Sequence, residues 1–186
     1  FRGRHFLDVA WRALDDQGLE DRKRWIRAAA AAFPWLDISQ GVGIYGGSAG
    51  GQAAMQALLN HGDLYRVAVA DCGCHDNRLD KIWWNEQWMG PDTQGEWYSR
   101  CSNAEQAHRL QDPQRLLLVV GELDDNVDPS STMRVVGALQ RAGKHNFELC
   151  VVVGHGHGAA DTRYGCERRR RFFLEHLMPH YRRSAL

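Results

Sequence analysis

The sequence predicts an α/β fold in which a mostly parallel sheet is covered by helices on both faces. Short runs of consecutive apolar residues alternate along the chain with longer segments that repeat apolar residues at helical spacing. The short runs lack the alternation of a half-exposed strand, which indicates strands that are buried on both sides. Strands that alternate with helices are typical of a parallel sheet, because each connection has to cross the sheet.

Four apolar runs are expected to form the strands: residues 42–45, 67–70, 116–120 and 147–153. Glycine or acidic residues follow each run, so a turn or polar loop is expected at the carboxyl end of every strand. The carboxyl ends of parallel strands lie at one edge of the sheet, where functional groups gather.

Helices are expected before, between and after these strands, over residues 6–14, 20–33, 50–59, 131–142 and 167–181. The second helix is amphipathic, with Trp25, Ile26, Ala29 and Phe33 on one face, and Pro34 ends it. Residues 83–103 are the least regular and are rich in aromatic side chains, so we expect a lid-like insertion over one end of the sheet.

Length, composition and charge are those of one globular domain, residues 1–186, with 44% hydrophobic residues. The 23 basic and 23 acidic residues balance, which argues against a dedicated nucleic-acid binder. The basic run 168–171 precedes an apolar helical stretch and indicates a solvated helix face. No apolar run is long enough for membrane insertion.

The five cysteines form no CxxC pair. Cys72 and Cys74 with His75 resemble half of a metal site, but the second ligand pair of a typical zinc site is missing. We therefore expect no metal and no cofactor. A single disulfide stays open, and its partners cannot be named from sequence.

Gly46-Gly47-Ser48-Ala49-Gly50 matches the nucleophile-elbow pattern G-x-S-x-G, and it lies directly between a predicted strand and a predicted helix. A sharp turn there would lift the Ser48 hydroxyl above the sheet and requires small neighbours. The helix amino terminus would offer the Ala49 N–H as an oxyanion donor. A nucleotide-binding glycine loop is the alternative, but G-x-G-x-x-G does not fit and a Walker lysine is missing. The motif therefore predicts an α/β-hydrolase fold.

An orienting acid and a histidine base are expected after the two remaining strands, in the order Ser, Asp, His. Asp124 and Asp125 follow the strand 116–120, and His155 and His157 follow the strand 147–153. The residues alone leave open which member of each pair acts. The other histidines are interpreted as surface or structural.

Together these landmarks resemble the prolyl oligopeptidase family of serine peptidases, on its dipeptidyl-peptidase IV side. The resemblance runs from about Gly18 to Leu177 and includes Glu86-Gln87-Trp88-Met89-Gly90, Asp124-Asp125-Asn126 and His157-Gly158. It favours Asp124 and His157 as the members of the triad with Ser48. It implies peptide substrates and a weak preference for a periplasmic or secreted location; a homodimer stays open.

Two substrate contacts are implied by the same resemblance. Asn126 matches an asparagine of the dipeptidyl-peptidase branch that binds a substrate carbonyl. Trp84 stands in the sequence near the position of a tyrosine that, in the family, lines the pocket for the residue before the cleaved bond. An indole in that pocket would suit a proline ring. Cleavage after proline or alanine is therefore expected. A carboxylesterase or lipase, or a non-catalytic interaction module with the same fold, are the alternatives.

The resemblance also implies parts that these residues do not supply. A β-propeller, the first strands of the hydrolase sheet and a tyrosine that is the second oxyanion donor are all expected upstream of Phe1. We therefore expect the chain to be the C-terminal part of a longer catalytic domain, and we expect residues 1–186 alone to show little peptidase activity.

Overall fold

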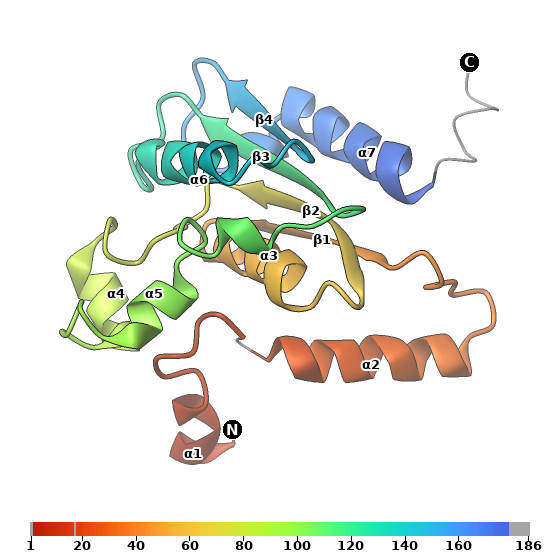
Figure 1. The fold of residues 1–186 in the computed structure, drawn as a ribbon, viewed down its shortest axis with the longest axis horizontal. Helices are drawn as coiled ribbons and strands as arrows, with labels where there is room; N and C mark the ends of the chain where they lie inside the picture. The colour runs from red at the N-terminus through yellow and green to blue at the C-terminus, as the bar shows by residue number, and fades with distance from the viewer. Residues whose placement is uncertain (1, 17, 179–186) are drawn as a thin grey trace.

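The computed structural model of the protein describes residues 2–16 and 18–178. Within these residues four parallel strands form one sheet in the order β1-β2-β3-β4 (Figure 1). The strands are β1 (Val42–Gly47), β2 (Tyr65–Asp71), β3 (Arg115–Gly121) and β4 (Phe147–Val152). In the register, Val69 lies between Tyr45 of β1 and Leu117 of β3. The predicted fold class is confirmed.

The helices alternate with these strands, as predicted. They are α1 (Gly3–Asp8), α2 (Leu19–Ala32), α3 (Ala49–Asn60), α4 (Ile82–Met89), α5 (Glu96–Cys101), α6 (Ser130–Arg141) and α7 (Arg163–Leu177), with short 3-10 turns η1 (Ala107–Arg109) and η2 (Ala159–Asp161). Helix α7 begins four residues earlier than expected, and the expected end at Tyr181 lies outside the described residues.

Helices cover both faces of the sheet. On one face, α3 and α6 pack against Leu116 and Leu118 of β3. On the other face, Phe172 of α7 packs against Leu117 and Val119. Leu116 to Val119 of β3 are thus buried alternately on the two faces of the sheet, which explains why the apolar run of β3 is continuous. Burial of each leucine side chain stabilises the fold by about 1.5–3 kcal/mol.

Two expectations about burial are wrong. Strand β1 is at the edge of the sheet among the described residues, and it alternates partly buried with exposed positions, Tyr45 being 38% exposed. The predicted apolar face of α2 is buried only in part, because Ile26 packs against the core whereas Trp25 is 72% and Phe33 48% exposed. That helix is anchored by Leu19 and by Lys23, whose ammonium pairs with Glu20 and Asp63.

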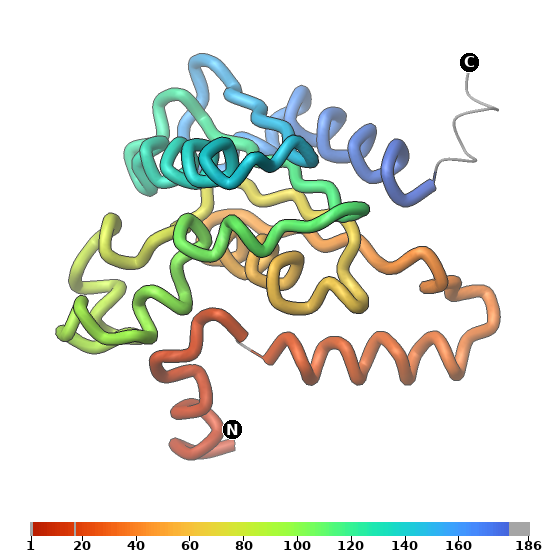
Figure 2. Tube along the Cα trace, in the orientation of Figure 1, coloured from red at the N-terminus to blue at the C-terminus, as the bar shows by residue number. Residues whose placement is uncertain are grey.

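The aromatic stretch 83–103 is more regular than expected, because it contains α4 and α5. Met89, Tyr98 and Cys101 form a small apolar cluster there with Leu14. The segment before α2 lies beside these two helices (Figure 2), and Arg100 fixes it by donating to the Asp15 carboxylate at 2.8 Å. The expected helix 6–14 is replaced by the shorter and earlier α1.

The sequence left one disulfide open, placed the basic run 168–171 on a solvated helix face and indicated no membrane insertion. All five cysteines are free thiols. The basic run 168–171 lies on α7 and is paired: Arg168 with Glu148, Arg169 with Asp161, and Arg170 and Arg171 with Glu167. In the described part of the chain, no helix is both long and apolar enough to cross a bilayer.

Acid should destabilise the fold through His75, which is fully buried on the loop after β2. Burial lowers the pKa of this imidazole from 6.5 to about 4. The unfolded state binds the proton more tightly than the folded state does. The contribution of His75 to stability is therefore present above pH 6.5 and is lost as the pH falls toward 4. Denaturant titrations should show that His75 lowers the free energy of unfolding by about 2 kcal/mol between pH 7 and pH 5. His75→Gln should remove that part of the loss; an equal loss in the variant would contradict it.

Candidate active site

Each of the four strands delivers one chemically functional side chain just past its carboxyl end. Ser48 follows β1, Cys72 follows β2, Asp124 lies three positions beyond Gly121 of β3, and His157 lies five beyond Val152 of β4. Since the strands are parallel, these ends share one edge of the sheet. Three of the four positions were predicted; Cys72 was not.

Ser48 occupies a strained turn between β1 and α3. Its backbone has φ 60° and ψ −124°, and its N–H donates to the Asp71 carbonyl at 2.9 Å. A Cβ at Gly46 would lie 2.1 Å from the Gly50 carbonyl oxygen, so residue 46 must be glycine. A Cβ at Gly50 would meet nothing within 4 Å, so glycine itself is not required at this position.

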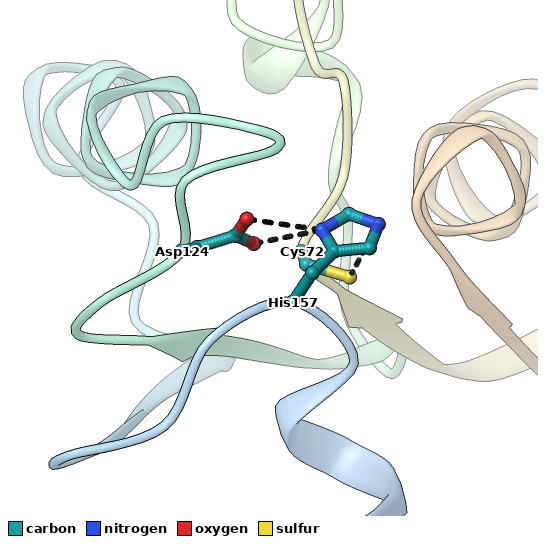
Figure 3. Close-up of side chains that lie close together, drawn as sticks. All are labelled: Cys72, Asp124 and His157. Carbon is teal, nitrogen blue, oxygen red and sulfur yellow. Dashed lines mark hydrogen bonds and ion pairs between the residues drawn. The ribbon is translucent and has the colours of Figure 1, made fainter.

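His157 and Asp124 form a close pair. His157 Nδ1 lies 2.9 Å from Asp124 Oδ2 and 3.1 Å from Oδ1, and Figure 3 shows the carboxylate facing this edge of the ring. The Asp124 side chain is completely buried, whereas that of His157 is 25% exposed. The arrangement leaves the second ring nitrogen for another partner, as a general base requires.

The loop after β3 holds the Asp124 carboxylate in place. Its Oδ1 accepts the backbone N–H groups of Asn126 at 3.0 Å and Val127 at 2.9 Å. The alternative acid, Asp125, is exposed. The alternative base, His155, is exposed as well, and its Nδ1 lies 3.0 Å from the Val153 carbonyl oxygen.

A glycine at the end of β3 lets the histidine loop approach. A Cβ at Gly121 would lie 2.2 Å from the Gly156 carbonyl oxygen and 2.4 Å from that of His155. The loop therefore crosses directly over the strand end that precedes Asp124. This close approach explains how His157 reaches Asp124 from a different strand.

Cys72 lies against the imidazole of His157 and was missed by the sequence analysis. Its Sγ is 3.8 Å from Nε2, and its backbone has φ 42°, which is unusual for a residue with a side chain (Figure 3). The thiol is buried, and burial raises its pKa to about 12. A thiol that stays protonated is a poor nucleophile, and Ser48 has the strained turn at the amino terminus of α3 that the nucleophile-elbow pattern requires. The position of Cys72 directly after a strand was the available signal.

Ser48 and His157 make no hydrogen bond to each other in this structure, within the described residues. Ser48 is partly buried at the start of α3, on the strand end next to the one that carries Cys72. Catalytic hydrogen bonds are often long in unliganded enzymes and shorten when substrate binds. The structure therefore pairs two of the three predicted residues and places the third on the same edge of the sheet.

One group of side chains has metal-binding geometry among residues 2–16 and 18–178. Ligand atoms of Cys72, Asp124 and His157 lie within 4.8 Å of one another. The Asp124 carboxylate, however, already accepts from His157 and from two backbone amides. Structural zinc sites usually have four ligands. Nor do Cys74 and His75 contribute, since Cys74 donates to Asp80 and His75 contacts Asn103.

The residues expected to bind substrate lie near this edge. Ala49 is the first residue of α3, where backbone N–H groups have no intrahelical acceptor. Trp84 of α4 and Ala49 both line a cavity of about 860 Å³ whose other walls include Phe6, Leu14 and Trp88. Asn126 is exposed beside Asp124, and its carbonyl accepts from Lys81.

Comparison with known proteins matches the chain to one family and one fold. The model of the prolyl oligopeptidase family matches residues 1–180. Dipeptidyl peptidase 8 from Mus musculus and from Homo sapiens are each 34% identical over 128 residues, which are 68% of this chain and 14% of each relative. Dipeptidyl aminopeptidase A from Saccharomyces cerevisiae is 27% identical over 118 residues, 62% of this chain and 13% of that protein.

Solved structures show the same architecture. A putative dipeptidyl aminopeptidase IV from Bacteroides ovatus superposes with a TM-score of 0.80 at 23% identity, covering 94% of this chain and 24% of that chain. Porphyromonas gingivalis dipeptidyl peptidase 4 superposes with a TM-score of 0.79 at 24% identity, with the same coverage. The chain thus spans about a seventh of the length of the mammalian relatives that it matches.

Proposed function

Because the chain belongs to the prolyl oligopeptidase family, we propose that it is a serine peptidase in which Ser48, His157 and Asp124 form the catalytic triad. The observation that carries the proposal is the buried Asp124 carboxylate 2.9 Å from Nδ1 of His157, on the same sheet edge as the strained Ser48 turn. A carboxylate hydrogen-bonded to Nδ1 in this way orients an imidazole so that Nε2 can accept a proton.

The reaction follows from these positions. Nε2 of His157 takes the Ser48 proton as Oγ attacks a peptide carbonyl, and Asp124 stabilises the imidazolium that forms. The imidazolium then protonates the leaving amine, and an acyl-enzyme ester remains on Ser48. Water, deprotonated by His157, hydrolyses this ester and releases the acyl product.

The oxyanion of the tetrahedral intermediate would be bound by the Ala49 N–H at the amino terminus of α3. Removal of one such donor typically lowers turnover by about 10²–10³-fold. Ala49 is the donor that the described residues offer from the elbow. We therefore expect slow turnover of peptides by residues 1–186 alone, and activated substrates and covalent probes are the sensitive readouts.

Substrate would lie between the elbow and α4. We propose that the cavity shared by Ala49 and Trp84 receives the side chain before the cleaved bond, and that proline or alanine fits there. Proline would stack on the indole of Trp84. The exposed amide of Asn126, beside Asp124, would bind a substrate carbonyl.

Trp84→Ala should weaken this subsite more than it weakens the chemistry. We expect kcat/KM for a Gly-Pro anilide to fall by about tenfold, while labelling of Ser48 by a small fluorophosphonate changes less than about twofold. The reason is the lost burial of proline against the indole, worth about 1–2 kcal/mol. Trp83→Ala is the matched control, because Trp83 is 68% exposed on the same helix. Equal effects of the two substitutions would exclude the proposed contact.

Two other functions remain to be separated from this one. A carboxylesterase would hydrolyse p-nitrophenyl butyrate far faster than a Gly-Pro anilide, relative to the uncatalysed rates. A non-catalytic module would react with neither substrate and would not be labelled by a fluorophosphonate. The peptidase proposal requires labelling of Ser48 together with anilide turnover in the same preparation, and that turnover is expected to be slow for residues 1–186 alone.

A further inference from the structure

The last residue of β2, Asp71, connects the two loops that carry Ser48 and His157. Its Cα partners are Gly47 of β1 and Val119 of β3, so it lies inside the sheet between the nucleophile strand and the acid strand. Its main-chain carbonyl accepts the Ser48 N–H at 2.9 Å. The backbone of Asp71 therefore helps to hold the strained turn of the nucleophile.

The Asp71 carboxylate reaches the histidine loop. The residue is completely buried, and Oδ2 accepts the backbone N–H of Ala160 at 3.1 Å. Ala160 belongs to η2, three residues beyond His157. This hydrogen bond ties the turn that follows His157 to the end of β2.

The other oxygen of this carboxylate has an unusual environment. Oδ1 is buried and has no hydrogen-bond partner among the described residues. No lysine or arginine in the described part of the chain forms an ion pair with Asp71. An unpaired buried carboxylate destabilises a fold unless a positive charge compensates it. Burial raises the pKa of the Asp71 carboxyl, while the Ala160 N–H and the Cys72 thiol favour its charged form. The titratable groups that interact with it are the Cys72 and Cys150 thiols, the Tyr45 hydroxyl, the Asp161 carboxylate and the His157 imidazole, and of these only the imidazole can become positive.

Asp71 and Cys72 are consecutive, and they act on the same ring. Cys72 has φ 42° and places its Sγ 3.8 Å from Nε2 of His157. Strained backbone of this kind persists only where the surroundings impose it, and it is concentrated at functional sites. His157 therefore has the Asp124 carboxylate at Nδ1 and the Cys72 thiol near Nε2, and the Asp71 carboxylate is bonded to Ala160 of its loop.

We propose that Asp71 is a positioning residue of the active site: its carboxylate anchors the His157 loop through Ala160, and its negative charge stabilises the imidazolium that forms when Ser48 loses its proton. The inference rests on the proposed function. It adds a second carboxylate to the pair formed with Asp124. Asp71 itself does not contact the reacting atoms.

The test compares Asp71→Asn and Asp71→Ala by the rate of Ser48 labelling with a fluorophosphonate between pH 5 and pH 9. Asparagine keeps an oxygen for the Ala160 N–H but removes the charge. We expect the labelling rate of Asp71→Asn to fall about tenfold, as for the loss of one charge at an intermediate effective dielectric constant. We also expect the acid limb of its pH–rate profile to move to lower pH. Alanine removes both interactions, and we expect a fall of about 100-fold.

Asp161→Asn is the matched control. Asp161 lies in the same η2 turn, but its side chain is 70% exposed, pairs with Arg169 and accepts from the Tyr45 hydroxyl at 2.8 Å. We expect the rate and the pH profile of this variant to stay within about twofold of wild type. Thermal melts check that each variant is folded.

The outcomes separate the inference from the proposed function. If the folded Asp71→Asn variant keeps the wild-type rate and acid limb, the electrostatic role is overturned, whatever alanine does. An alanine variant that is folded and only as slow as asparagine would overturn the anchoring role. If wild-type protein is folded but Ser48 is not labelled at all, the proposed function itself fails, and the inference fails with it.

Discussion

Replacing Ser48 with alanine should abolish the acyl-enzyme burst. With p-nitrophenyl butyrate we expect wild-type protein to release about one equivalent of p-nitrophenol in a rapid first phase, which is the kinetic sign of covalent catalysis. The variant should show no burst, and its steady rate should fall steeply, because removal of a triad nucleophile typically lowers kcat by about 10⁶-fold. Stopped-flow absorbance at 405 nm, near the absorption maximum of p-nitrophenolate, measures both phases.

Cys72→Ser is the control for this experiment. The thiol lies 3.8 Å from Nε2 of His157, so it is the one other side chain of the described site with nucleophilic chemistry next to the base. Its raised pKa, about 12, argues that it stays protonated. The burst should therefore survive in Cys72→Ser. A burst lost from Cys72→Ser but kept in Ser48→Ala would make the cysteine the nucleophile.

The second large effect is expected from Asp124→Asn. An amide at this position cannot hold the His157 tautomer that leaves Nε2 free to accept a proton, and the loss in kcat should be about 10⁴-fold. The fold should be little changed, since the oxygen that accepts from the Asn126 and Val127 amides can be retained.

Asp125→Asn provides the comparison for that variant. Asp125 is adjacent in sequence and exposed, with no hydrogen bond to either histidine of the loop among the described residues. Its rate should stay within about twofold of wild type. Similar losses in the two variants would mean that the effect arises from the loop as a whole and not from the carboxylate that faces His157.

Much of this architecture could be predicted from sequence because its signals are local. The continuous apolar run 116–120 indicated a strand covered on both faces, and Leu116 to Val120 are buried as that pattern requires. The turn at Ser48 was equally local, since a strand, small residues and a helix follow one another within a few positions. That an acid after β3 would meet a histidine after β4 followed from the rule that parallel strands end at one edge, and the family resemblance favoured Asp124 and His157.

Other features depend on tertiary contacts that no local pattern records. The spacing of α2 places Trp25 and Ile26 on one apolar face, yet only Ile26 packs against the core and the tryptophan stays exposed. The helices α4 and α5 were hidden because aromatic residues in 83–103 break the apolar period. Asp71 appeared as an ordinary polar residue after a strand; its role depends on Ala160, which is 89 positions away in sequence.

The central claim is that Ser48 is the nucleophile activated by His157 and Asp124. Treating the folded protein with a fluorophosphonate and mapping the adduct by tandem mass spectrometry tests this claim most directly. We predict a single adduct on the peptide that contains Ser48, at a rate that falls sharply in Asp124→Asn. An adduct on Cys72, or no adduct on protein that remains folded, would contradict it.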